Sequence, residues 1–213
     1  MGDGKLATVA GVVLAAVLVV SVVPHGARAQ DAPGGAEQVA ASIERLAAEA
    51  AARPDDVSLR IELGNLYYET GLLDKAVEEY RSAVGLDSLH VGARLNLASV
   101  YVDQGSAAQA LLELQKARSI DPANPMVYTN LGSTYYWLQR YTEAVEMYLE
   151  ALALDPGCVE AHFNLGVAFA DAQIFDEAIR EWGKVVELAP GSPVARTSAD
   201  NIRMIEEFRA GGR

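Results

Sequence analysis

The chain has 213 residues, of which 51% are hydrophobic and 22% charged, so its composition is not that of a disordered polypeptide. Seventeen Lys and Arg residues against 29 Asp and Glu residues give a net charge of −12. This acidic balance argues against nucleic-acid binding, which needs basic side chains to displace counterions from phosphates. A single cysteine excludes an internal disulfide framework and every multi-thiolate metal site.

The N-terminal residues have the pattern of an export signal. Residues 6–23 are an uncharged apolar run, preceded by Lys5 and followed by Pro24. The triplet 27–29, Ala-Arg-Ala, is typical of a signal peptidase site. We therefore predict a signal peptide over residues 1–29 and a protein that works in the bacterial periplasm or is secreted. The apolar run also just reaches the length that spans a bilayer, so the alternative is an uncleaved inner-membrane anchor over residues 6–23.

A short linker and one helix are predicted next. Residues 30–35 contain Pro33, Gly34 and Gly35, which favours a flexible spacer. Apolar residues then recur at steps of three and four between 36 and 53, the spacing of an amphipathic helix, and Pro54 ends the pattern. We interpret residues 36–56 as a helix that caps the N-terminal end of the remaining chain.

Beyond residue 56 the chain resembles itself every 34 residues. A Leu-Gly or Leu-Ala pair occurs at 63–64, 97–98, 131–132 and 165–166, and an aromatic residue comes three positions later each time. Each unit has two apolar stripes at helical spacing, one on either side of a turn. The pattern predicts four units over residues 57–90, 91–124, 125–158 and 159–192, and a C-terminal capping helix and tail over residues 193–213.

The period and the order of Leu-Gly, aromatic, Ala and Pro resemble the tetratricopeptide repeat (TPR) family. The resemblance implies an all-α, right-handed solenoid of helix-turn-helix repeats, closed by N- and C-terminal capping helices. It also implies that the first helix of each repeat (helix A) lines a concave face and the second (helix B) a convex face. Position 4 of each repeat, often Trp in the family, departs from the pattern, since it is occupied by Arg60, Arg94, Tyr128 and His162.

The turns inside the repeats depend on local chemistry. Gly71 and Gly105 are expected to adopt the left-handed conformation that ends helix A. Gln139 and Gln173 occupy the same place in the third and fourth repeats. We expect Asp74, Thr142 and Asp176 to cap the B helices by accepting hydrogen bonds from free backbone amides.

Candidate binding residues come from the concave positions of the family. An asparagine offers a donor and an acceptor that match a peptide backbone, and aromatic side chains supply apolar anchors. The alternative is that the asparagines bond neighbouring helices and that the aromatic residues pack between helices. The predicted peptide-binding residues are Asn65, Asn96, Asn130, Asn164, Tyr68, Tyr136, Trp137 and Phe163.

Charge narrows the predicted partner. The basic places of the family's carboxylate clamp are occupied by Ile61 and Met126, so binding of acidic C-termini is not expected. The predicted lining is acidic, with Glu62, Glu69, Asp103, Glu160 and Asp171. An acidic ligand would therefore meet like-charge repulsion, and we expect a neutral to basic peptide.

No catalytic, cofactor-binding or metal-binding motif is recognisable, so we do not expect an enzyme, a cofactor or a small-molecule substrate. Cys158 is interpreted as an exposed or half-buried loop thiol, and His162 as a helix-A residue without a metal partner. The sequence thus predicts a non-catalytic protein-interaction module that binds an extended peptide or partner protein, with a role in envelope or secreted-protein assembly. The alternative is a structural scaffold that acts through homo-oligomerisation or its convex face.

Overall fold

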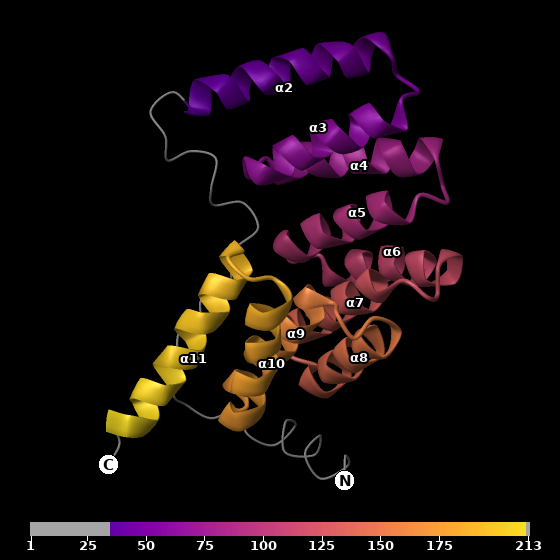
Figure 1. The fold of residues 1–213 in the computed structure, drawn as a ribbon. Coiled ribbons are helices and arrows are strands. Elements are labelled where there is room, and N and C mark those ends of the chain that lie inside the picture. Colours follow the sequence, from indigo (N-terminus) through magenta and orange to yellow (C-terminus); the bar gives the residue numbers. More distant parts are fainter. Residues whose placement is uncertain (1–34, 212–213) are drawn as a thin grey trace. The chain divides into compact units, whose positions relative to one another are not determined.

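A computed structural model describes residues 35–211, and every regular element in that range is an α-helix (Figure 1). The predicted signal peptide or anchor over residues 1–29 lies outside the described residues, as does the linker up to residue 34. No helix between residues 35 and 211 is long and apolar enough to cross a membrane. The described residues belong to two compact units, 35–122 and 123–211.

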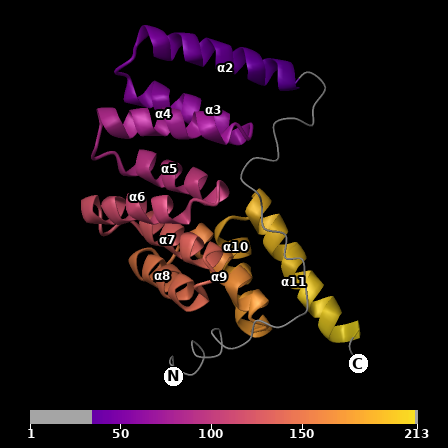
Figure 2. The same cartoon turned by 180° about the vertical axis from the view of Figure 1, so that it is seen from behind.

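The first unit contains five helices among its described residues: α2 (Gly35–Ala52), α3 (Val57–Glu69), α4 (Leu73–Leu86), α5 (Val91–Asp103) and α6 (Ala107–Ile120). They lie side by side in chain order (Figures 1 and 2). The predicted helix over 36–53 is α2, which packs on α3 and buries Leu46 and Ala50. Its bounds each lie one residue before those of the 36–53 pattern, and residues 53–56 of the segment interpreted as a capping helix are not helical.

The second unit contains α7 (Pro125–Trp137), α8 (Tyr141–Leu154), α9 (Val159–Asp171), α10 (Phe175–Leu188) and α11 (Pro193–Gly211). The last of these runs beside α10, as Figures 1 and 2 show. The A helices α3, α5, α7 and α9 each have 13 residues, and the B helices α4, α6, α8 and α10 each have 14. The helix bounds therefore repeat at the predicted 34-residue interval without a slip.

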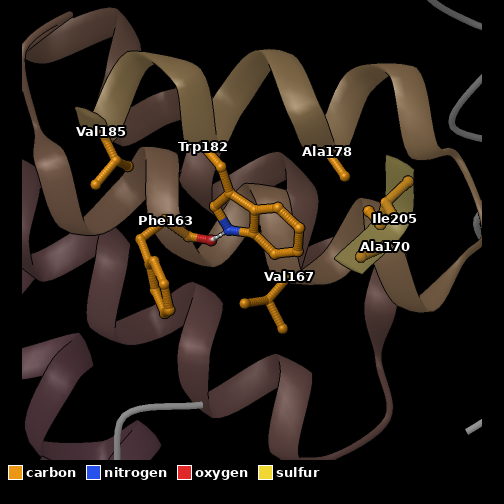
Figure 3. Close-up of a cluster of buried hydrophobic side chains, with 7 residues drawn as sticks. All are labelled: Phe163, Val167, Ala170, Ala178, Trp182, Val185 and Ile205. Atoms are coloured by element: carbon orange, nitrogen blue, oxygen red, sulfur yellow. Dashed lines mark hydrogen bonds between the residues drawn. The ribbon is translucent and has the colours of Figure 1, made fainter. Parts of the chain in front are cut away.

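Small residues allow the two helices of a repeat to cross closely. A Cβ atom added at Gly132 would lie 2.5 Å from the ring of Tyr148, and one at Gly166 would lie 2.5 Å from the indole of Trp182. Figure 3 shows this indole packed among Phe163, Val167 and Ile205, with its N–H donating to the Phe163 carbonyl oxygen at 3.1 Å. A larger side chain at these glycines cannot be accommodated without moving a buried ring.

The turns confirm one prediction and correct another. Gly71, Gly105, Gln139 and Gln173 all have positive φ, between 59° and 75°, as expected for the left-handed end of helix A. The predicted caps of helix B are wrong, because each B helix begins before the proposed residue. Residues Leu72, Ser106, Arg140 and Ile174 occupy the N-cap positions, and none of them makes a side-chain capping bond. Asp74 instead lies in the first turn of α4 and accepts a hydrogen bond from Gln104 Nε2.

At three of the four positions, the departure at repeat position 4 is explained by a polar contact with a glutamate of helix B. Arg60 donates to Glu79 at 2.9 Å, Arg94 to Glu113 at 2.5 Å, and His162 Nδ1 lies 2.7 Å from Glu181. Each basic side chain also contacts a carbonyl six residues earlier, that of Pro54, Ser88 or Pro156. In the third repeat the two places are occupied by Tyr128 and Met147. These contacts join helix A to helix B in the first, second and fourth repeats.

One buried cysteine and two buried polar residues depart from the expectation or were not foreseen by it. Cys158, expected to be exposed or half-buried, is buried, since it precedes α9 directly and packs with Ala151 and Ala161. In α11, Ser198 and Asn201 are buried, and the Ser198 Oγ and Asn201 Nδ2 atoms have no hydrogen-bond partner among the described residues. Ser198 stands one period after Asn164, so α11 occupies the sequence position of a further helix A.

Candidate functional site

The predicted asparagines of the first unit join neighbouring A helices. Asn96 on α5 donates its amide to Asn65 Oδ1 on α3 at 3.0 Å. The same Oδ1 atom accepts from the Tyr80 hydroxyl on α4 at 2.6 Å. Asn65 Nδ2 has no partner among the described residues, and the Asn65 side chain is exposed. These asparagines therefore stabilise the stack and keep part of their hydrogen-bonding capacity for a ligand.

The second unit repeats this arrangement with a serine. Asn164 on α9 donates to Ser133 Oγ on α7 at 3.2 Å, and the Tyr148 hydroxyl of α8 donates to the same oxygen at 3.3 Å. Asn130 differs, because its side-chain amide makes no hydrogen bond within the described residues. Among the four predicted asparagines, Asn130 is thus the one whose amide is unused inside the described fold.

Each unit also has a tyrosine–aspartate pair near the C-terminal ends of its two A helices. The Tyr68 hydroxyl donates to Asp103 Oδ2 at 2.6 Å, and the Tyr136 hydroxyl donates to Asp171 Oδ2. Burial, followed by the hydrogen bond to the carboxylate, raises the pKa of each tyrosine above its usual value. Both phenols therefore stay protonated, and both aspartates remain exposed acceptors at the surface.

The predicted aromatic anchors differ in accessibility. Trp137, the last residue of α7, is 65% exposed, whereas Phe163 is 7% exposed and belongs to the core around Trp182 (Figure 3). Tyr136 is half-buried and makes an edge-to-face contact with Tyr141. Trp137 offers the large apolar surface, and in this conformation Phe163 offers little.

The exposed charge of the A helices is acidic. Arg60 and Arg94 are the basic residues of α3, α5, α7 and α9 apart from His162, and both arginines are paired with helix-B glutamates. The side chains of Glu62, Glu69 and Glu160 are exposed and make no ion pair among the described residues. We call the exposed side chains of these four helices the helix-A face; in each unit it presents uncompensated carboxylates. Between residues 35 and 211, no group of three His, Cys, Asp or Glu side chains is placed to hold a metal ion.

Sequence reasoning missed the partners of the predicted residues. Tyr80 and Tyr148 come 15 residues after Asn65 and Ser133. Each helix-B glutamate comes 19 residues after its partner at repeat position 4. These intervals recur between repeats, so a comparison of equivalent positions could have identified both sets. In the third repeat both places have uncharged residues, Tyr128 and Met147, and this joint change also indicates that the two positions are partners.

Comparison with protein families identifies the repeats. A model of the tetratricopeptide repeat matches residues 129–193, and a second model of the TPR repeat matches residues 64–105 and 98–139. The matches together span more than half of the chain, which therefore belongs to the tetratricopeptide repeat proteins. The predicted fold class, an all-α solenoid of TPR helix-turn-helix repeats, is confirmed.

Solved structures share this fold. A thermophilic TPR protein of Thermus thermophilus, TTC0263, is 21% identical with a TM-score of 0.69, and the match covers 78% of this chain and 92% of that one. PilF of Pseudomonas aeruginosa is 28% identical with a TM-score of 0.59, over 71% and 70% of the two chains. MamA is 25% identical with a TM-score of 0.58, over 72% and 90%. No match was found among curated proteins. TPR repeats are in general non-catalytic modules of protein–protein interaction, and no enzyme family is indicated.

Proposed function

We propose that the protein is a non-catalytic adaptor whose helix-A face binds an extended, neutral to basic segment of a partner protein. The observation that carries the proposal is Trp137, a 65% exposed aromatic residue directly after the Tyr136–Asp171 pair. Large exposed aromatic side chains are typical anchors of protein interfaces, and carboxylates beside them favour a basic or neutral partner.

The asparagines supply a second support for this proposal. Among the described residues, the Asn65 Nδ2 donor makes no hydrogen bond. The same is true of both the donor and the acceptor of the Asn130 side-chain amide. A peptide backbone carries one donor and one acceptor per residue, which these amides match without reading a particular side chain. Each unit therefore offers an amide to a bound backbone, Asn65 in the first and Asn130 in the second, and in the second unit Trp137 and the exposed carboxylates select among partners.

The experiment places a photo-reactive phenylalanine analogue at Trp137, with Leu154 on helix B as the matched exposed control. We expect partner adducts from position 137 and none from position 154. Asn130→Ala should weaken adduct formation at position 137 without lowering the melting temperature. Equal labelling from both positions, or binding that Asn130→Ala leaves intact, would contradict the proposal.

We further propose that this binding takes place outside the cytoplasm, in envelope or secreted-protein assembly. The support is the apolar run 6–23 followed by the triplet 27–29. N-terminal sequencing of the mature protein should begin at Gln30 if the signal is cleaved. A protein that retains Met1 and fractionates with the membrane would indicate the anchor, and a protein that retains Met1 in the cytosol would overturn export.

One observation favours the scaffold alternative. Phe208, near the end of α11, is 53% exposed and contacts Phe175 edge to face. An exposed aromatic residue on a capping helix is a candidate contact between two copies of the chain. Analytical ultracentrifugation of the native protein and of Phe208→Ser tests this function: a stable dimer that the substitution dissociates supports it, and a monomer excludes it.

A further inference from the structure

A depression of about 330 Å³ in the first unit is lined by α4, α5 and α6, and neither Asn65 nor Asn96 contributes to its lining. The buried residues Leu97 and Tyr101 of α5 line it in part. The remaining lining comes from Arg81, Val84 and Gly85 of α4 and from Gln109, Leu112, Glu113 and Lys116 of α6. Leu112 is 53% exposed. The depression therefore combines apolar side chains with two basic residues and the largely buried carboxylate of Glu113.

Gly85 lines this depression and has no side chain to occupy it. It lies inside α4, where glycine is unfavourable relative to alanine, and its φ is not positive. A Cβ atom added there would meet nothing within 4 Å. Neither the backbone conformation nor close helix packing therefore requires a glycine at this position.

The second unit has larger or uncharged residues at the corresponding positions of its sequence. Two 34-residue periods after Arg81, Val84 and Gly85 come Leu149, Leu152 and Ala153. Leu152 is larger than Val84, and Ala153 is larger than Gly85. Leu149 is apolar, whereas Arg81 carries a positive charge. The depression and its free charge are therefore features of the first unit that the repeat pattern does not demand.

The rim of the depression is positively charged, although the whole chain has a net charge of −12. The Arg81 side chain makes no hydrogen bond or ion pair within the described residues. Lys116 Nζ donates to Glu113 Oε1 at 2.7 Å, but the other oxygen of Glu113 accepts from Arg94. One carboxylate thus serves two cations, and Arg81 adds a third that has no carboxylate partner among the described residues.

We propose that this depression is a second docking site, which takes one large apolar side chain carried by an acidic segment of a partner protein. Leu97, Tyr101 and Leu112 would contact the apolar side chain, while Arg81 and Lys116 attract the flanking carboxylates. The volume lies at the lower end of the roughly 300–1,000 Å³ of small-molecule sites, and the depression is open to solvent. A side chain presented by a protein suits it better than a small molecule that must be enclosed. Its charge preference is opposite to that of the helix-A face.

Fluorescence anisotropy with a labelled nine-residue peptide, one central phenylalanine flanked by glutamates, tests this site on the full chain. Two comparison peptides replace the phenylalanine by serine or the glutamates by lysines. We expect the acidic phenylalanine peptide to bind, and each comparison peptide to bind at least about tenfold more weakly, a difference of about 1.4 kcal/mol.

Variants locate the binding. Gly85→Leu fills the depression, and Arg81→Leu introduces the residue of the second unit; each should weaken binding about tenfold or more. Gly183→Leu is the matched control, because Gly183 lies inside the B helix α10 and a Cβ atom there also meets nothing within 4 Å. It should bind like the native protein, and so should Trp137→Ala. The proposal is overturned if the acidic peptide does not bind at about 1 mM, if Gly85→Leu binds it normally, or if Trp137→Ala abolishes binding.

Discussion

The repeat helices of the units 35–122 and 123–211 have the same lengths and the same 34-residue interval, yet the two units differ in the residues at their turns and on their surfaces. The first unit ends its A helices at Gly71 and Gly105, whereas the second places Gln139 and Gln173 in the same left-handed conformation. The first unit leaves a depression beside Gly85, where the second has Ala153. The period therefore determines where helices begin and end, and the residues between these points are free to differ in conformational cost and in surface chemistry.

The largest expected effect concerns the buried ion pair of the second repeat. Arg94 and Glu113 have side chains only 8% and 11% exposed. Replacing Glu113 by Met leaves a buried guanidinium without its carboxylate, and should lower the free energy of unfolding by about 3–5 kcal/mol. The double variant Arg94→Tyr with Glu113→Met, which copies the third repeat, should recover most of this loss. Denaturant unfolding measures both; a double variant as unstable as the single one would show that the pair is not interchangeable between units.

The next largest loss of stability is expected where the two helices of a repeat cross. Gly132→Ala would place a Cβ atom 2.5 Å from the buried ring of Tyr148, and overpacking of this kind costs about 1–3 kcal/mol. Gly85→Ala is the control, since its Cβ meets nothing and alanine favours the helix. Thermal unfolding should show a lower midpoint for the first variant and an equal or higher one for the second. Equal midpoints would mean that the Tyr148 ring has room to move.

Substitutions at the turns should change the free energy of unfolding by less. Gln139→Gly removes the strain of a left-handed non-glycine residue and should stabilise the second unit by about 1 kcal/mol. Gly71→Gln should destabilise the first unit by a similar amount. Unfolding in urea measures both changes. If Gln139→Gly instead lowers stability, the glutamine side chain makes a contribution that outweighs its backbone strain.

The asparagines should show the smallest difference in stability. Asn96→Ala loses the hydrogen bond to Asn65 and should cost about 1 kcal/mol, whereas Asn130→Ala loses no hydrogen bond of the described fold and should cost close to nothing. Both variants retain the same helix lengths, so melting temperatures compare them directly. A larger loss from Asn130→Ala than from Asn96→Ala would reverse this assignment of roles.

The helices and their turns could be predicted from the sequence because apolar spacing and the period constrain them strongly. The predicted caps failed, because Leu72, Arg140 and Ile174 occupy N-cap positions for which side-chain chemistry gives no signal. Cys158 was misjudged, since it comes after a loop in sequence but is covered by Ala151 and Ala161 in space. Asn96 and Asn164 were recognised as a recurring feature, but their donor groups are used between helices, and a single position cannot reveal where its hydrogen bond goes.

The identical bounds of successive helices have an evolutionary consequence. Each A helix begins 34 residues after the previous one, and each B helix does the same, so no insertion or deletion separates the copies. Duplication or loss of one whole repeat in the gene would preserve the reading frame and the spacing of every junction. Because the depression is lined by residues of both the first and the second repeat, loss of either repeat would remove it, and only a duplication that carries the two repeats together would copy it.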